Sequence, residues 1–310
     1  MAALSAAVVG PGGVGGLLGG LLVRAGARVE FVASERTAEA LRAGGLSVHS
    51  ATHGDFHVPV TATTELSGPV DVCFVTTKAT TLAAALERVP PAALGDGLVV
   101  PLLNGFEHMA LLRRRYPAEQ VVAGVVRVES TRVAPGRIEH TSPFLAFELA
   151  SATAPRQRVE ALAARLREAG LQVTVRDDET VALWDKLTFL ATFALLTTYH
   201  AAPAGVIRAE HRDELTAVLR EITAVAAAEG AVFDPERILA FFDGLPPQMK
   251  SSMQRDAEAG RPTELDALGG AVLRAAERHG VAAPTVARLV AELAARNRPS
   301  AGELTDLSPL

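Results

Sequence analysis

A run of glycines near the N-terminus lies between a strand pattern and a helix pattern, and it limits the folds open to this chain. The run reads Val8-Val9-Gly10-Pro11-Gly12-Gly13-Val14-Gly15-Gly16. A short apolar strand is expected before it, at Leu4 to Val9, and a helix after it, at Leu17 to Arg24. Glycine-rich turns are common in proteins, but here the strand, the helix and the N-terminal position agree.

Three of these glycines have the G-x-G-x-x-G spacing that dinucleotide-binding loops require. Gly10 permits the tight strand-to-helix turn, Gly12 lets the backbone approach a pyrophosphate, and Gly15 lets the helix pack closely on the strand. The amide N–H groups and the dipole of the following helix then face the phosphates. We therefore expect a dinucleotide cofactor here, contacted by Gly10, Gly12, Gly13, Val14 and Gly15.

The first half of the chain alternates between strand and helix patterns, which indicates a doubly wound parallel sheet of the Rossmann type. A helix is expected from Thr37 to Ala43. The further expected strands are Arg28–Ala33, Val70–Thr76, Gly97–Leu103 and Val121–Val128.

Later segments change in character. Arg137–His140 and Phe144–Leu149 are predicted to form a hairpin around Thr141-Ser142-Pro143, while Ser151–Pro155 and the Pro299–Leu310 tail look loosely structured. From Asp178 onward the periodicity is helical, with almost no strand signal. We therefore predict an α/β dinucleotide-binding domain, residues 1–177, followed by an all-α substrate and catalytic domain, residues 178–310.

Charge and composition indicate an enzyme of the cytoplasm rather than a nucleic-acid or membrane protein. The formal charge is −5, and the one basic run, Arg113 to Arg115, is interpreted as the end of a helix. The single cysteine, Cys73, excludes a disulfide framework and suggests a reducing compartment. The N-terminus lacks the basic region of a signal peptide, and we expect no apolar run long enough to cross a bilayer. No metal site is predicted.

The end of the second strand bears on the choice of nicotinamide cofactor. An acidic residue there would hold the ribose 2′-hydroxyl of NAD, but the position falls at Ala33. Ser34 and Arg36 follow, and an arginine suits the 2′-phosphate of NADP(H). Glu35 argues against that choice, since a carboxylate would repel the phosphate. NADPH is favoured over NADH.

Lysine is rare in this chain: of the 30 basic residues, only Lys78, Lys186 and Lys250 are lysines. A partly buried lysine can be tuned toward neutrality, whereas arginine keeps its proton. Lys186 lies in a helix pattern, Val181 to Phe193, that is apolar nearly all round. Its ammonium must reach the surface, pair with a carboxylate or line a cavity, and a desolvated lysine suits proton donation.

Polar side chains follow two neighbouring strands of the predicted sheet. Lys78 ends the strand that includes Val72 to Thr77, and Asn104 follows the next strand, before Gly105. The carboxyl ends of parallel strands are where ligands bind in open sheets, so both side chains are candidate ligand contacts.

Paired serines and a threonine–glutamate pair mark the helical half. Ser251 and Ser252 lack an explanation in helix capping. Thr263 is predicted to be the N-cap of a later helix, with Asp266 three residues on as in a capping box and Glu264 as a first-turn carboxylate.

Together these motifs resemble the ketopantoate reductase (2-dehydropantoate 2-reductase) family over nearly the whole chain. They are the glycine loop, Val75-Thr76-Thr77-Lys78, Leu103-Asn104-Gly105, Trp184-x-Lys186-Leu187 and the block from Ser251 to Asp266. The resemblance implies NADPH-dependent reduction of a 2-keto acid. By it, Lys186 is the general acid, Glu264 orients Lys186 or contacts the substrate, and Ser252 binds the substrate's polar end. Lys78 and Asn104 lie between the nicotinamide ribose and the substrate.

The chain departs from the family at two substrate positions. Family members usually carry asparagines one and two turns after the catalytic lysine, where this chain has Leu190 and Ala194. Each lost hydrogen bond costs about 1–3 kcal/mol, unless residues such as Lys250 or His200 compensate. Three hypotheses stay open: reduction of ketopantoate or a close 2-keto acid, reduction of a less polar ketone or an imine, and a dinucleotide-binding sensor that has lost catalysis. The Ala- and Leu-rich helical domain could also form a homodimer face.

Overall fold

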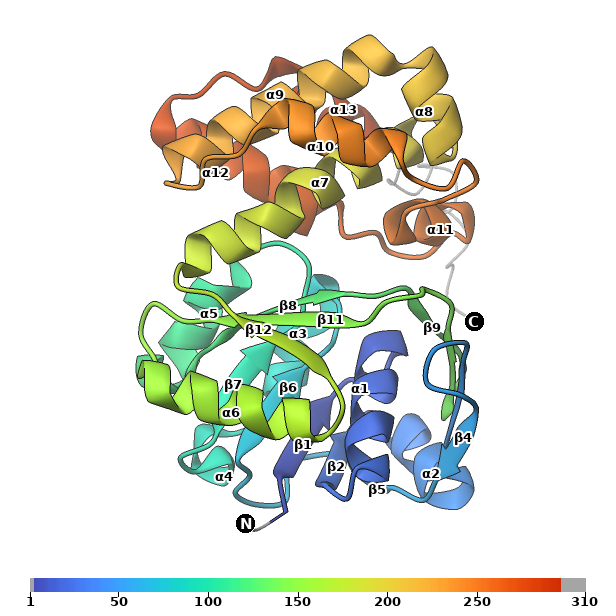
Figure 1. Cartoon of the computed structure of the whole chain (residues 1–310), viewed down its shortest axis with the longest axis vertical. Helices are drawn as coiled ribbons and strands as arrows, with labels where there is room; N and C mark the ends of the chain where they lie inside the picture. The colour runs from blue at the N-terminus through green and yellow to red at the C-terminus, as the bar shows by residue number, and fades with distance from the viewer. Residues whose placement is uncertain (1–2, 297–310) are drawn as a thin grey trace, which may run out of the picture. The chain divides into compact units, whose positions relative to one another are not determined.

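A computed structural model describes residues 3–296, so the predicted loose tail from Pro299 lies outside the described residues. The chain divides into two compact units between Leu183 and Trp184. In Figure 1 the first unit runs from blue to yellow-green and the second from yellow to red. The division falls inside the helix α7 (Glu179–Tyr199), a few residues after the boundary predicted at 177.

A five-stranded sheet forms the centre of the first unit, in the order β5-β2-β1-β6-β7, and all its pairs are parallel. Its strands are β1 (Ser5–Val9), β2 (Arg28–Val32), β5 (Thr61–Thr63), β6 (Val72–Val75) and β7 (Leu98–Pro101). Strands β2 and β6 flank β1 on opposite sides, so the chain changes direction across the sheet at β1. Ligands bind at the carboxyl ends of strands at such a switch point.

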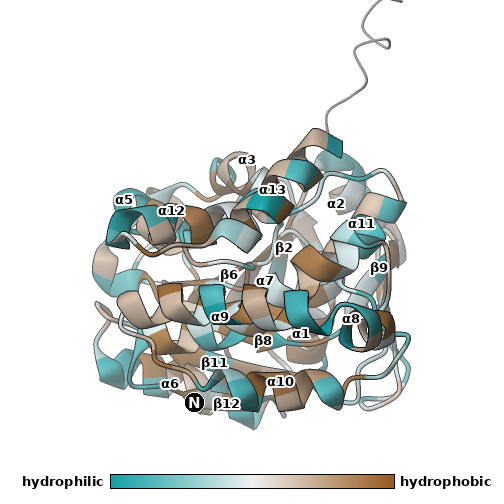
Figure 2. Ribbon diagram, turned by 90° about the horizontal axis from the view of Figure 1, so that it is seen from above, coloured by the Kyte–Doolittle hydropathy of each residue, from teal (hydrophilic) through white to brown (hydrophobic). Residues whose placement is uncertain are grey.

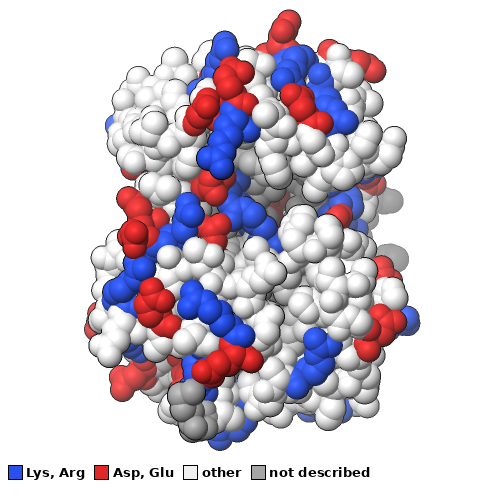
Figure 3. Space-filling view, viewed as in Figure 1, with Lys and Arg blue, Asp and Glu red and all other residues white. Residues whose placement is uncertain are grey.

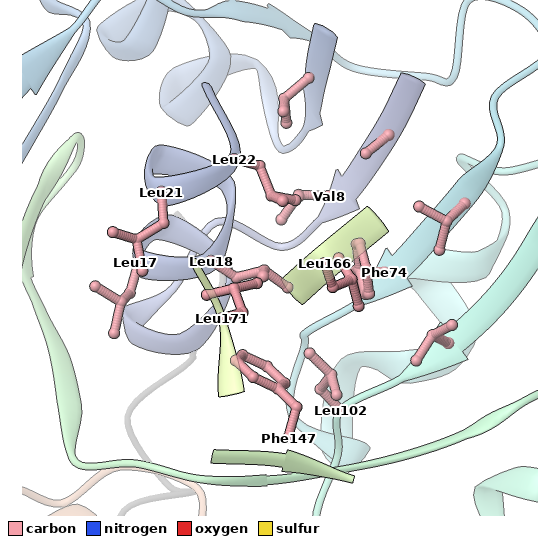
Figure 4. Packing of buried hydrophobic residues seen from close by; sticks show 14 of the residues in the cluster. Val8, Leu17, Leu18, Leu21, Leu22, Phe74, Leu102, Phe147, Leu166 and Leu171 are labelled. Atoms are coloured by element: carbon pink, nitrogen blue, oxygen red, sulfur yellow. The ribbon is translucent and has the colours of Figure 1, made fainter. Parts of the chain in front are cut away.

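Both faces of this sheet are buried. Alternate residues of β1 point to opposite faces: Ala6 and Val8 belong to one apolar cluster and Ala7 and Val9 to another. Figure 4 shows part of the first cluster, in which Leu22 of the helix α1 (Gly13–Arg24) lies beside Val8, while Leu17 and Leu21 point to the other side of the helix. The second cluster includes α3 (Leu82–Leu86) and α5 (His108–Arg115). Burial on both faces is typical of parallel sheets and confirms the doubly wound fold.

The remaining helices of the first unit connect the strands. They are α2 (Glu35–Gly44), η1 (Ala79–Thr81), α4 (Pro91–Leu94), η2 (Ala118–Gln120) and α6 (Arg156–Glu168). As predicted, Arg113 to Arg115 form the last turn of α5.

Two smaller sheets complete the first unit, and they show that the predicted hairpin was wrong. One has the order β4-β3-β10-β9 and the other β12-β11-β8. Their strands are β3 (Leu46–Ser50), β4 (Phe56–Val58), β8 (Ala123–Arg127), β9 (Ser130–Ala134), β10 (Arg137–His140), β11 (Ala146–Ala150) and β12 (Gln172–Val175).

The strands expected to pair with each other, β10 and β11, therefore lie in different sheets. Instead, β10 forms a hairpin with β9 through the turn Pro135-Gly136, where Gly136 has a φ of +71°. Pro-Gly is a stronger turn signal than the Ser142-Pro143 step. The Ser142 hydroxyl accepts from the amide of Glu129 and donates to the carbonyl of Phe144, which holds this segment as a crossing between sheets.

Strand β8 also differs from its prediction as a member of the main sheet. It pairs antiparallel with β11, and a single parallel bridge, Val99 to Val121, links this region to β7.

The described residues of the second unit form helices and no strand, which confirms an all-α C-terminal half. They are α7, α8 (Ala204–Glu210), α9 (Arg212–Ala228), α10 (Pro235–Asp243), α11 (Ser252–Glu258), the π-helical segment η3 (Asp266–Gly270), α12 (Ala271–His279) and α13 (Pro284–Arg296). Figure 2 shows hydrophilic and hydrophobic residues alternating along α9, α12 and α13, as expected of helices that bury one face.

Helix α7 is the exception, because it is apolar nearly all round. It is long and apolar enough to cross a bilayer, so the prediction that no run had this length was wrong. However, 67% of its most apolar window is buried in the protein, as in the central helix of a helical core.

The charged side chains are mixed in sign on the surface, and the single cysteine is buried. On the face drawn in Figure 3, described basic side chains lie among acidic ones rather than gathering in one patch. Burial raises the pKa of the Cys73 thiol to about 12, so this cysteine stays protonated inside β6.

Candidate active site

The predicted cofactor residues follow four neighbouring strands at one edge of the main sheet. Because these strands are parallel, the glycine loop after β1 shares that edge with the segments that follow β2, β6 and β7. Those segments carry Ser34 and Arg36, Lys78, and Asn104, respectively.

Each glycine of the loop meets a different neighbour. Gly10 has a φ of +82°, which favours glycine. A Cβ on Gly13 would lie 2.0 Å from the carbonyl oxygen of Ser130, and one on Gly15 would lie 2.2 Å from Oγ1 of Thr76. Gly12 is open: the nearest atom to a Cβ there is 3.9 Å away. Gly10, Gly13 and Gly15 therefore serve the fold, and Gly12 leaves a space.

The amide groups at the start of α1 are directed out of the helix. Helix α1 begins at Gly13, four residues before the predicted start, and Gly12 is its N-cap. The first intrahelical hydrogen bond runs from the amide of Gly16 to the carbonyl of Gly12, at 2.8 Å. The preceding amides of Gly13, Val14 and Gly15 lie in the first turn, where no acidic side chain competes. Such amides and the helix dipole favour an anion such as a pyrophosphate.

Two threonines after β6 support this loop, and the sequence interpretation gave them no role. The Thr76 hydroxyl lies 2.9 Å from the carbonyl of Val9 and 2.8 Å from that of Gly10, which fastens the loop to the strand end. Thr77 packs its methyl group against Gly10, while its buried Oγ1 has no hydrogen-bond partner among residues 3–296. A buried hydroxyl without a partner beside a phosphate-type loop fits a missing polar ligand.

The segment after β2 suits the 2′-phosphate better than its sequence suggested. Ser34 is the N-cap of α2, its hydroxyl 3.2 Å from that of Thr37, and Arg36 is exposed in the first turn. The Glu35 carboxylate, which would repel a phosphate, pairs with Arg42 at 2.7 Å. No described residue forms an ion pair or side-chain hydrogen bond with Arg36.

Lys78 and Asn104 lie in the loops after β6 and β7. Lys78 is exposed at the N-cap of η1, and Asn104 is partly buried just before Gly105, which has a φ of +84°. Val75 pairs with Pro101 in the register of β6 and β7, so these loops start side by side.

In the second unit, α7 carries the predicted acid and the two apolar substitutions. Lys186, Leu190 and Ala194 are spaced by four residues and therefore share a helix face. Lys186 and Leu190 are partly buried, and Ala194 is buried.

An aromatic cluster lies beside this face. The Phe189 ring lies 5.6 Å from that of Phe193 and 5.0 Å from that of Phe241 on α10. Phe241 is 58% exposed, which is unusual for so large an apolar side chain. These rings and Leu190 form apolar surroundings for this segment of α7.

The paired serines have different roles. Ser251 is the N-cap of α11: its hydroxyl accepts from the amide of Gln254 at 3.0 Å and lies 2.8 Å from that of Thr197 on α7. Ser252, the predicted substrate contact, is exposed in the first turn of α11. Ser251 therefore fixes α11 to α7 and so positions Ser252.

The predicted capping box around Thr263 was misplaced by one residue, because the helix begins after Glu264 rather than after Thr263. The Asp266 carboxylate pairs with Arg274 at 2.8 Å. The first helical bond is from the amide of Leu268 to the carbonyl of Glu264, so Glu264 stands at the helix start, with 7% of its surface exposed. One residue, Leu265, separates it from the π-helical segment η3, a type of distortion that is common at functional sites.

The two residues considered as compensating contacts are engaged elsewhere. The Lys250 ammonium lies 2.8 and 3.0 Å from the carboxylate oxygens of Glu258. His200 contacts Glu214, its Nε2 2.6 Å from that carboxylate.

Comparison with known proteins follows the same division of the chain. Residues 6–151 match the family model described as ketopantoate reductase PanE/ApbA, and residues 180–297 match its C-terminal counterpart. The chain is 33% identical to "Uncharacterized oxidoreductase YkpB" of Bacillus subtilis over 92% of this chain and 96% of that protein. It is 31% identical to the 2-dehydropantoate 2-reductase of Caulobacter vibrioides over 93% and 98% of the two chains. The fold is similar to the crystal structure of 2-dehydropantoate 2-reductase from Geobacter metallireducens, with a TM-score of 0.87, 30% identity and coverage of 94% and 100%.

Proposed function

Because this chain belongs to the ketopantoate reductase family, it is an oxidoreductase acting on a carbonyl or CH–OH group, and we propose that it reduces a 2-keto acid with NADPH. Family members use a dinucleotide, and the observation that carries the cofactor proposal is the open backbone at Gly12 beside the outward amides of α1. NADPH is proposed over NADH because Arg36 has no described partner and Glu35 is turned to Arg42.

The residues of the first unit would hold the cofactor along the sheet edge. The amides of Gly13, Val14 and Gly15 would bind the pyrophosphate, Ser34 and Arg36 the 2′-phosphate. Lys78 and Asn104 would contact the nicotinamide ribose and the substrate. When bound, the reduced nicotinamide supplies a hydride to the carbonyl carbon.

Lys186 is proposed to donate a proton to the carbonyl oxygen as negative charge develops there. Its partly buried position on an apolar helix would limit the access of water to the ammonium. The buried carboxylate of Glu264 would orient that ammonium or bind the substrate, and Ser252 would bind the substrate's polar end.

The variants Lys186→Ala and Lys186→Arg test this role together. Arginine keeps the positive charge but cannot release its proton, so both changes should lower kcat by about 100-fold or more. NADPH affinity should stay as in the wild type, measured by calorimetric titration. An arginine variant with wild-type turnover would show that Lys186 contributes only charge.

A second candidate function is reduction of a less polar ketone or an imine. Leu190 and Ala194 offer no hydrogen bond to a hydroxyl or carboxylate, and the exposed Phe241 adds apolar surface near α7. NADPH oxidation with ketopantoate, bulkier 2-keto acids, ketones and imines separates the two. The variant with Leu190→Asn and Ala194→Asn sharpens the comparison.

Restoring both asparagines should raise kcat/KM for ketopantoate roughly 10-fold or more if their hydrogen bonds are what is missing, since each is worth about 1–3 kcal/mol. Thermal unfolding of the variant checks that the buried polar group at position 194 is tolerated. A wild-type preference for ketopantoate, unimproved by the asparagines, would exclude the second function.

A further inference from the structure

Two histidines and a carboxylate meet in the second unit, away from the residues proposed for catalysis. His200 follows the last residue of α7, His211 is the N-cap of α9, and Glu214 lies in the first turn of α9. One possible ligand atom from each lies within 4.8 Å of the other two. Lys186 is fourteen residues before His200, which is roughly 20 Å along a helix. The cluster is therefore separate from the proposed acid.

This cluster is partly exposed, and one of its three side chains forms no hydrogen bond with a described residue. The side chains of His200 and Glu214 are 18% and 20% exposed. The His200 and His211 rings stack, with centroids 3.6 Å apart. Among the described residues, none forms a hydrogen bond with the ring nitrogens of His211. Stacking alone leaves those nitrogens available to a ligand.

Both oxygens of the Glu214 carboxylate have partners in the protein. Arg288 on α13 binds Oε1 of Glu214, and Oε2 faces His200 at 2.6 Å. Arg288 also lies 3.4 Å from Glu292, which partly balances its charge. An outer partner that fixes a ligand's orientation is a usual feature of metal sites.

We propose that His200, His211 and Glu214 bind a zinc ion or a similar first-row divalent cation. Two imidazoles and one carboxylate are a frequent protein donor set for zinc, whereas Mg²⁺ and Ca²⁺ prefer oxygen ligands alone. Three protein ligands leave a fourth position for water.

Binding requires a small rearrangement of the two rings. Zinc–nitrogen bonds of about 2.0–2.1 Å place tetrahedral ligands roughly 3.3 Å apart, so the rings must turn out of their stack until their lone pairs converge. Nε2 of His200, which faces Glu214, must also carry no proton to bind the ion. The tautomer with its proton on Nδ1, an atom with which no described residue forms a hydrogen bond, meets that requirement.

The ion would join the end of α7 to the start of α9 across α8. Because the three ligands come together only in the folded chain, zinc should stabilise the native state by an amount that rises with the logarithm of the zinc concentration divided by Kd. The site would thus fix one end of the helix that carries Lys186, while leaving the cofactor loop unaffected.

Titration of the metal-free full chain with zinc chloride, followed by calorimetry, tests this proposal. His211→Ala is the main variant, because it removes a ligand and only a stacking contact. His279→Ala is the matched control, since His279 also pairs with a glutamate, Glu229 at 2.9 Å, but has no second histidine described beside it. Wild type and H279A should bind one equivalent. H211A should bind at least about 10-fold more weakly, because even outer partners of metal sites change affinity by 10–100-fold.

Thermal unfolding in the presence of zinc gives an independent measurement. The melting temperature should rise with zinc for wild type and H279A, and not for H211A. Glu214→Gln replaces H211A if circular dichroism shows that H211A does not fold. The proposal is overturned if wild type binds no zinc saturably, if H211A or E214Q binds it as wild type does, or if magnesium chloride binds equally well.

Discussion

Replacing Gly12 by alanine adds a single Cβ atom, which should change cofactor affinity strongly and folding stability little. A Cβ at this position would have its nearest neighbour 3.9 Å away, and the φ of −81° is allowed for alanine. Alanine restricts the unfolded chain but is a poorer N-cap than glycine. These effects oppose each other, so the free energy of unfolding should change by less than about 1 kcal/mol.

The same methyl group should greatly weaken NADPH binding, because it occupies the space through which a pyrophosphate reaches the amides of α1. Loss of two charge-assisted hydrogen bonds, at about 1.5–3 kcal/mol each, corresponds to roughly a 100- to 10,000-fold rise in Kd. Calorimetric titration with NADPH and a thermal melt of the same sample measure both quantities.

Gly13→Ala is the matched control. Its Cβ would lie 2.0, 2.5 and 2.9 Å from the backbone O, C and N atoms of Ser130 and Thr131, which cannot move aside as a flexible side chain can. Overpacking of this kind costs about 1–3 kcal/mol or more, although alanine is otherwise the better helix former. If G12A binds NADPH as tightly as wild type, the pyrophosphate does not lie on this loop. If G13A is as stable as wild type, the close packing of β9 on α1 is wrong.

Three further outcomes are expected. Arg36→Ala should weaken NADPH binding about 10- to 100-fold, because one charge-assisted contact is lost, and leave NADH binding nearly unchanged. Equal losses of affinity for the two cofactors would exclude recognition of the 2′-phosphate by this side chain. Cys73 should resist thiol reagents in the native protein at mildly alkaline pH and react on denaturation, because burial raises its pKa to about 12; fast native labelling would contradict its placement. Glu179→Gln should lower the free energy of unfolding, measured with urea, by about 3 kcal/mol. The guanidinium of Arg113 lies 2.6 and 2.8 Å from the buried Glu179 carboxylate and would lose its counter-charge. An unchanged urea midpoint would refute this pairing.

Local pattern was enough to predict the central fold. Strands such as β1, β6 and β7 are continuous apolar runs followed by glycine or polar residues, and their parallel order follows from the helices between them. The chain order also implied that Lys78 and Asn104 follow neighbouring strands. The predicted hairpin fails because Ser142-Pro143 resembles a hairpin turn in sequence, whereas the chain turns at the stronger signal Pro135-Gly136.

Contacts between residues far apart in the sequence could not be predicted from local sequence patterns. Ser251 could not be interpreted because its partner, Thr197, lies 54 positions earlier. Asp266 matched a capping box in sequence, but the helix begins one residue later than that box requires, and the Asp266 carboxylate pairs with Arg274, eight positions on. For His200 the sequence indicates only a cap or an exposed donor, since nothing in it shows that α8 returns the chain to place His211 against that ring.

The π-helical segment η3 has a consequence for how Glu264 could change over generations. A π turn holds one residue more than an α turn, and each α-helical residue turns the chain by about 100°. Deleting a single residue within η3 would let α12 continue as an ordinary α-helix, with its apolar face kept in register. Glu264, at the free end, would swing by about that angle around the axis. Loss of a single codon would therefore keep the helical packing and change the direction in which the Glu264 carboxylate points.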